Sequence, residues 1–149
     1  MAIEYLDARG PDGLARKYRV MFIDGKTFPL HLAISHLWKV HYFTSGMADN
    51  AAHRKEERRF LENMPTALGE RAMATLDEIR SEVGSYYFGV DFALAADGRV
   101  LLFEANAAMV VIAPPLEPIW DYRRGPVAVI LEAAKRMALS RVLAGGGGK

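Results

Sequence analysis

The sequence predicts an α+β domain in which a largely antiparallel β-sheet packs with about three helices. Two pairs of apolar, β-prone segments are each joined by an Asp-Gly dipeptide, which readily forms tight hairpin turns. Charged segments with apolar residues at helical spacing separate the two hairpins, and another follows the second hairpin. The order hairpin, two helices, hairpin, helix favours a layered α+β or α/β domain.

Composition excludes several classes of protein. The chain has 149 residues, of which 51% are hydrophobic, enough for one globular domain with a core. Lys and Arg number 19 against 18 Asp and Glu, so we expect neither nucleic acid nor a membrane surface as a partner. No cysteine is present, which excludes disulfides and thiol chemistry. With neither a signal-peptide core nor a membrane-spanning apolar run, we expect a cytoplasmic protein.

The first predicted hairpin runs from Arg16 to Ser35 and turns at Asp24-Gly25. This turn places Arg19 opposite Leu30, on a side of the hairpin that is otherwise apolar. A cation there is expected either to face a cleft or to partner an acid. Lys17 lies on the same side.

The remaining segments predict the helices and the tail. Trp38 to Phe43 is either a short strand or a loop, and Asp49 or Asn50 is available to cap the helix that follows. Gly84 is placed to end the next helix. We place the domain at residues 1–143 and a flexible glycine-rich tail at residues 144–149. The helices are predicted at Asp49–Met64, Leu68–Val83 and Pro126–Leu143.

The second hairpin, from Ser85 to Met109, contains polar residues in apolar strands. With Asp97-Gly98 as a two-residue turn, Asp91 faces Glu104 and Gly89 faces Asn106, all on one side of the sheet. The small residues beside Asp91, which are Gly89 and Ala93 (opposite Leu102), would leave room for a ligand. The other side is predicted to be the core, with Phe88, Val90, Phe92, Leu94, Leu101 and Phe103.

The facing carboxylates require an explanation. Opposed Cβ atoms lie roughly 5 Å apart, and two like charges at that distance destabilise a sheet. A divalent cation such as Mg²⁺ would offset the repulsion, because it prefers carboxylate and amide oxygens. Neighbouring Lys or Arg side chains, or a proton on one acid, would offset it equally. Without metal, we expect Asp91→Asn to stabilise the protein by about 1 kcal/mol.

The residues Gly-Val-Asp-Phe, an Asp-Gly turn and Leu-Phe-Glu-Ala-Asn resemble the metal-binding end of the ATP-grasp superfamily. The resemblance is closest to its carboxylate-amine ligase branch, which includes glutathione-synthetase-like ligases, and it covers the carboxyl-terminal half of that fold. It implies that Asp91, Glu104 and Asn106 hold Mg²⁺, or Mn²⁺, against the phosphates of ATP.

The resemblance also implies the other nucleotide contacts. Arg19 is the catalytic candidate and, with Lys17, a basic contact to the nucleotide, while Leu102 would form the apolar floor under adenine. Asp7 or Asp12 could accept the ribose hydroxyls, although loop aspartates usually serve turns. The segment "IEYLD" is similar to the hinge of the fold, where backbone groups would bind the adenine edge around Glu4, Tyr5 and Leu6.

The implied chemistry is ATP-dependent ligation. A substrate carboxylate attacks the γ-phosphate, and an amine or thiol then displaces phosphate from the acyl phosphate. Because the earlier, phosphate-covering lobe of the fold has no counterpart here, we expect activity to require a missing lobe or a second chain. The alternative is a non-catalytic module that forms a homo-oligomer. The four histidines lack the spacing of a zinc site, and "HRKEERR" is expected to be a solvated helix face.

Overall fold

The structure, a computed structural model, describes residues 9–37, 42 and 45–145. Its strands are all antiparallel and form one four-stranded sheet in the order β2-β1-β3-β4. The predicted α+β class with an antiparallel sheet is therefore confirmed. The strands are β1 (Ala15–Ile23), β2 (Lys26–Ser35), β3 (Tyr87–Leu94) and β4 (Val100–Asn106). The helices are α1 (Ala51–Glu62), α2 (Met64–Leu68), α3 (Glu70–Val83) and α4 (Asp121–Gly145), with a 3₁₀ turn, η2, at Pro118–Trp120.

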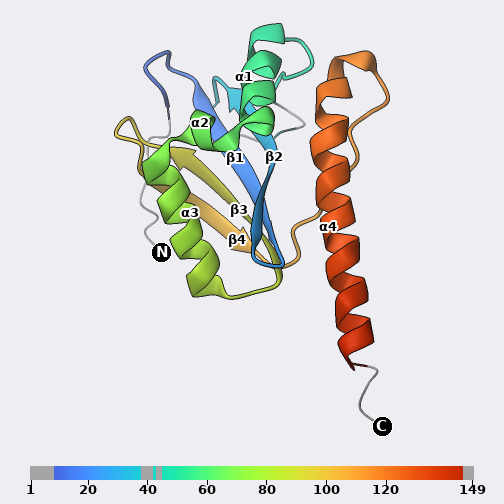
Figure 1. Cartoon of the computed structure of the whole chain (residues 1–149). Helices are drawn as coiled ribbons and strands as arrows, with labels where there is room; N and C mark the ends of the chain where they lie inside the picture. The colour runs from blue at the N-terminus through green and yellow to red at the C-terminus, as the bar shows by residue number, and fades with distance from the viewer. Residues whose placement is uncertain (1–8, 38–41, 43–44, 146–149) are drawn as a thin grey trace, which may run out of the picture.

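The layers follow the two faces of the sheet. Helices α1, α2 and α3 lie on one face, and α4 runs along the other side of the molecule next to β2 and β1 (Figure 1). The larger core lies under the first three helices and contains Phe22, Phe88, Val90 and Phe92. A smaller core between the sheet and α4 contains Met21, Ile23, Leu30, Met109, Val127 and Ile130. Within the described residues, no helix has both the length and the apolar content needed to cross a bilayer.

The first hairpin turns where the sequence predicts. Asp24 and Gly25 have φ angles of 48° and 77°, so both residues take the left-handed conformation of a two-residue turn. Further along the hairpin the register shifts, and Arg19 pairs with His31. The expected pairing of Arg19 with Leu30 is therefore wrong. The shift lies beside Pro29, which has no N–H to donate to the ladder.

The first helices begin and end near the predicted residues. The Asn50 side chain caps α1 by accepting hydrogen bonds from two backbone N–H groups, at 3.0 and 3.2 Å. Gly84 ends α3 with a φ of 60°, which confirms its predicted role. Of the segment Trp38 to Phe43, only Tyr42 lies within the described residues, so the choice between strand and loop there stays open.

The second hairpin has the predicted pairing of Asp91 with Glu104, but its turn and its register near the turn differ from the prediction. Its connection is a loop of residues 95–99, and Leu94 pairs with Val100. A bulge after Leu102 then restores the register, so Asp91 faces Glu104 as predicted. The expected pair of Ala93 with Leu102 is wrong, because Leu102 pairs with Phe92.

Strand β4 lies at the sheet edge and is much more exposed than β3. Phe103, predicted to be in the core, is 46% exposed, and Leu102 is 44% exposed. The burial prediction for Phe103 is therefore wrong, because Phe103 is the extra residue of the bulge and pairs with no residue of β3. Buried strand β3, which has neighbours on both sides, keeps its predicted core face.

The last helix begins earlier and ends later than predicted. It starts at Asp121 rather than Pro126, which lies within its second turn. A proline early in a helix removes only one backbone hydrogen bond, so the residues before it can still be helical. The helix continues to Gly145, so residues 144 and 145 belong to it rather than to a tail, and residues 146–149 lie outside the described part of the chain.

Candidate functional site

Asp91 lies in β3 and forms a buried cluster with two cations from β1. The register of these strands pairs Arg19 directly with Asp91. Arg19 donates from Nε and Nη2 to the two carboxylate oxygens of Asp91, at 2.5 and 2.8 Å. Lys17 Nζ lies 3.0 Å from Asp91 Oδ2. Asp91 is 3% exposed, so these two cations neutralise its carboxylate inside the protein.

The electrostatics of this cluster lower the pKa of Asp91. Burial alone would raise this pKa, but the hydrogen bonds and charge of Arg19, together with the charge of Lys17, outweigh burial. The carboxylate is therefore ionised at neutral pH. The expected stabilisation by Asp91→Asn does not follow from this geometry, because the substitution would remove the anion that both cations contact.

Glu104 and Asn106 extend the cluster along β4. Asp91 pairs with Glu104, and Gly89 pairs with Asn106, as the sequence predicts. Asn106 donates from Nδ2 to Glu104 Oε1 at 3.0 Å, and it accepts at Oδ1 from the N–H of Ala108 at 2.7 Å. Because side chains alternate along a strand, the three predicted ligand residues share one face of the sheet.

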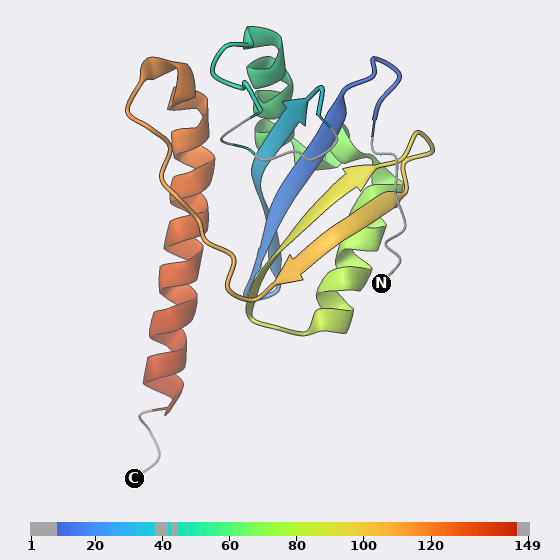
Figure 2. The same ribbon diagram turned by 180° about the vertical axis from the view of Figure 1, so that it is seen from behind.

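This face is the one turned away from α3. Figure 2 shows β3 and β4 from that side, with α4 lying beside β2 rather than over β4. None of the described helices covers the β4 part of the face, and the Glu104 side chain is exposed. A ligand could therefore reach the cluster from the β4 edge.

The space beside Asp91 differs from the prediction. A Cβ added at Gly89 would lie 2.6 Å from Met109 Cγ and 2.8 Å from Met21 Sδ, so these methionines occupy the room that glycine leaves. Ala93 is fully buried. The expected open space on both sides of Asp91 is therefore wrong, and the accessible part of the site is at Glu104.

The donor set suits magnesium only under one condition. Carboxylate and amide oxygens are appropriate ligands, but both oxygens of Asp91 already contact cations. The described residues include no group of three or more acidic or histidine side chains placed to hold a metal ion. A metal at Asp91 would require Lys17 or Arg19 to move to another anion. Nucleotide phosphates are such an anion, so the residues fit magnesium bound together with a nucleotide rather than alone.

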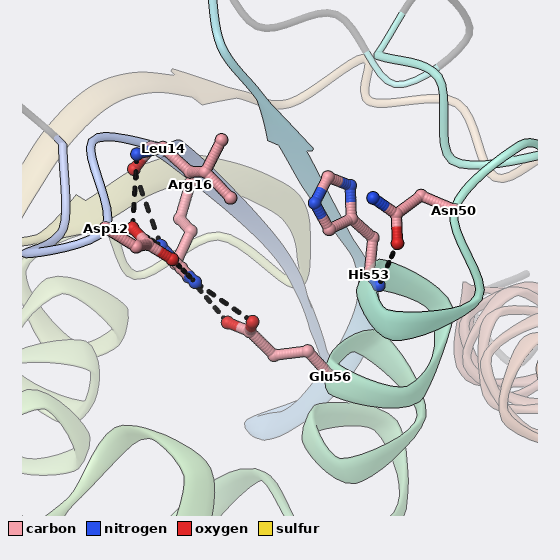
Figure 3. Close-up of polar contacts among 6 residues, drawn as sticks. All are labelled: Asp12, Leu14, Arg16, Asn50, His53 and Glu56. Carbon is pink, nitrogen blue, oxygen red and sulfur yellow. Dashed lines mark hydrogen bonds and ion pairs between the residues drawn. The ribbon is translucent and has the colours of Figure 1, made fainter.

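Asp12 has a structural role. Its carboxylate accepts from both Nη atoms of Arg16, at 2.9 and 2.8 Å, and from the N–H of Leu14 at 3.1 Å (Figure 3). Arg16 also donates to Glu56 of α1 at 2.6 and 3.0 Å. These hydrogen bonds to Asp12 stabilise the turn before β1, a role that loop aspartates commonly have. The other predicted contacts in the amino-terminal segment lie outside the described residues: Glu4, Tyr5, Leu6 and Asp7.

A second buried charge cluster, centred on Glu57 of α1, was missed by the sequence analysis. Glu57 is 0% exposed. It accepts from the N–H of Leu32 at 3.2 Å and from the Tyr42 hydroxyl at 3.0 Å. It also accepts from the Tyr122 hydroxyl, and Arg123 Nε lies 3.4 Å from Glu57 Oε1. The cluster joins α1, β2 and α4.

A sequence signal for Glu57 exists within the charged segment. Phe60, Leu61 and Met64 follow Glu57 at spacings of three, four and seven residues, which place all of them on one face of a helix. All three apolar residues are buried. The prediction of a solvated face for "HRKEERR" is therefore wrong at Glu57, while its neighbours Lys55 and Arg58 are not buried.

No model of a known protein family matches the chain, and no curated protein matches it. The resemblance to the ATP-grasp superfamily therefore remains a hypothesis, which the binding experiments below test.

Proposed function

We propose that the chain is the nucleotide- and magnesium-binding half of an ATP-dependent carboxylate-amine or carboxylate-thiol ligase that acts in the cytoplasm. The observation that carries this proposal is the meeting of oxygen ligands and cations on one sheet face. Asp91, Glu104 and Asn106 supply the oxygens, and Lys17 and Arg19 supply positive charge beside them. A magnesium nucleotide requires both kinds of group.

The cations would change partners when nucleotide binds. In the structure, Asp91 holds both Lys17 and Arg19. Phosphate oxygens would attract these cations and free oxygens of Asp91 next to Glu104. Bound magnesium would neutralise phosphate charge.

Arg19 would then bind the phosphoryl group that is transferred. Once a phosphate-covering lobe is also present, the substrate carboxylate would attack the γ-phosphorus and ADP would leave. The amine or thiol would then attack the resulting acyl phosphate, and phosphate would leave.

Calorimetry with MgADP tests this site. We expect the wild type to bind MgADP and Glu104→Ala to bind it at least about tenfold more weakly, because losing a charged ligand removes more than ~1.4 kcal/mol. The control is Glu78→Ala, an exposed glutamate on α3, which should bind like the wild type. Mg²⁺ without nucleotide should give no binding heat. Equal affinity of the wild type and Glu104→Ala would reject the site.

We expect no ATP turnover, since no glycine-rich loop among the described residues lies between a strand and a helix.

The exposed edge strand favours a second candidate function, a non-catalytic module that self-associates. Among the described residues β4 pairs only with β3, which leaves its other edge open, and its Leu102 and Phe103 side chains are exposed. Two copies could pair these edges around a twofold axis.

Sedimentation at several protein concentrations tests self-association. We expect a dimer that Phe103→Lys dissociates and Leu116→Lys, at an exposed position outside β4, leaves intact. A monomer at every concentration would reject this candidate.

A further inference from the structure

A small cavity lies between β2, the segment after β4 and the start of α4. Its volume is about 50 Å³. About 10–15 Å³ of such volume is enough to hold one water molecule, so this cavity has room for one small polar group. Its lining combines basic side chains with an apolar wall, including Arg19, His31, Arg123, Leu30, Val110 and Ile112.

One buried nitrogen atom on a residue of this cavity lacks a partner. His31 is 8% exposed and Arg123 is 5% exposed. His31 Nε2 has no hydrogen-bond partner among the described residues, whereas Arg123 Nε, which makes no hydrogen bond of good geometry, lies 3.4 Å from Glu57 Oε1. Buried polar atoms are almost always paired, and leaving one unpaired is destabilising. The His31 nitrogen therefore indicates that a hydrogen-bond acceptor is missing.

The same two side chains are held in place by Tyr42. The rings of His31 and Tyr42 stack with centroids 4.6 Å apart, and the Arg123 guanidinium lies 4.3 Å from the centroid of the Tyr42 ring. The Tyr42 hydroxyl in turn donates to buried Glu57. A ligand would therefore meet a prearranged pair of side chains, which reduces the entropy lost on binding.

The charges around the cavity favour an anion. Arg19 and Arg123 both line it, and none of the described residues that line it is acidic. The buried carboxylates of Asp91 and Glu57, which contact these arginines, lie outside the lining. Burial, and then the charges of the two arginines, lower the pKa of His31, which is consequently neutral and can donate from one ring nitrogen.

We propose that this cavity binds the carboxylate group of a small organic acid, with Arg123 and His31 as donors and the apolar wall around the acid's carbon chain. Arg19 lines this cavity and also contacts Asp91, so the acid would lie beside the proposed phosphate site. The acid's role as the ligase substrate rests on the proposed function, whereas its binding does not.

An NMR titration tests the binding. Sodium acetate is added to the ¹⁵N-labelled full chain in chloride-free buffer with EDTA and without nucleotide. We expect saturable shifts of the Arg123 Nε–H signal and of the indole N–H of Trp120, which lies next to Arg123. Arg123→Gln should weaken binding at least tenfold. The matched control, Arg124→Gln, changes a neighbouring arginine that pairs with Asp121 on the helix surface, and it should bind like the wild type.

A second variant covers the case in which Arg123→Gln fails to fold. His31→Phe preserves the contact of Arg123 with Glu57 and can still stack on Tyr42, and we expect it to weaken acetate binding at least fivefold. The proposal is overturned if the wild type shows no saturable binding, if His31→Phe binds as tightly as the wild type, or if inorganic phosphate shifts the Arg123 and Trp120 signals at lower concentration than acetate does.

Glu104→Ala separates this proposal from the proposed function, because that variant should bind acetate normally. Acetate binding together with failed MgADP binding would reject the nucleotide site alone. The reverse result would reject the carboxylate cavity alone.

Discussion

We expect the Asp91→Asn variant to unfold with a free energy about 3 kcal/mol lower than that of the wild type at pH 7. The substitution leaves Arg19 and Lys17 without the anion that they contact at 2.5 to 3.0 Å. Removing one partner of a buried ion pair commonly destabilises a protein by about 3–5 kcal/mol, and the lower end applies here because both cations keep some solvent access. Urea denaturation of the two proteins measures the difference.

The pH dependence of this difference identifies its cause. The pKa of Asp91 is lower in the folded protein than its usual value of about 3.9. The stabilisation is therefore fully present at neutral pH and is lost as the pH falls below about 4 through the folded-state pKa. We expect the difference between the two proteins to shrink at pH 3. Asp77→Asn, which removes an exposed surface pair with Arg80, should cost less than about 1 kcal/mol. An Asp91→Asn variant as stable as the wild type at pH 7 would contradict the buried cluster.

The sequence predicts the hairpins because their signals are local. The Asp24-Gly25 turn requires only two adjacent residues that accept positive φ angles, and it forms as predicted. The bulges are not local, since they depend on how each strand fits its neighbour. The Asp91–Glu104 pair was nevertheless predicted, because the longer loop at residues 95–99 and the bulge after Leu102 shift the register in opposite directions.

The partners of Asp91 could not be fixed from the spacing of its own hairpin. Arg19 reaches Asp91 because β3 pairs with β1, and this strand order is not encoded in either hairpin alone. The spacing alone is therefore equally compatible with basic side chains, a proton on one acid, or metal beside the facing acids. Arg123 and Glu57 lie 66 positions apart in the sequence and meet only when α4 packs beside α1. Such contacts follow from tertiary packing rather than from local pattern.

We expect Glu57→Ala to destabilise the protein by about 4 kcal/mol, the largest effect among these substitutions. It would leave Arg123 as a buried cation without its carboxylate, and it would remove the acceptor for both tyrosine hydroxyls. A small domain has a total stability of about 5–15 kcal/mol, so thermal unfolding should shift strongly. Glu62→Ala, at an exposed position on the same helix, is the control and should change stability by less than about 0.5 kcal/mol.

The Glu57→Gln variant separates the charge of Glu57 from its hydrogen bonds, because glutamine keeps an acceptor oxygen. Burial raises the pKa of Glu57, against the opposing influence of Arg123 and the hydrogen bonds that Glu57 accepts. Because the folded-state pKa is raised, the stability that Glu57 contributes is fully present below the usual pKa of about 4.3. It is lost as the pH rises through the raised pKa. The wild type should therefore lose stability relative to Glu57→Gln between pH 4 and pH 8. If chemical denaturation instead shows the wild type gaining stability relative to Glu57→Gln over this range, Arg123 and the hydroxyl donors outweigh burial.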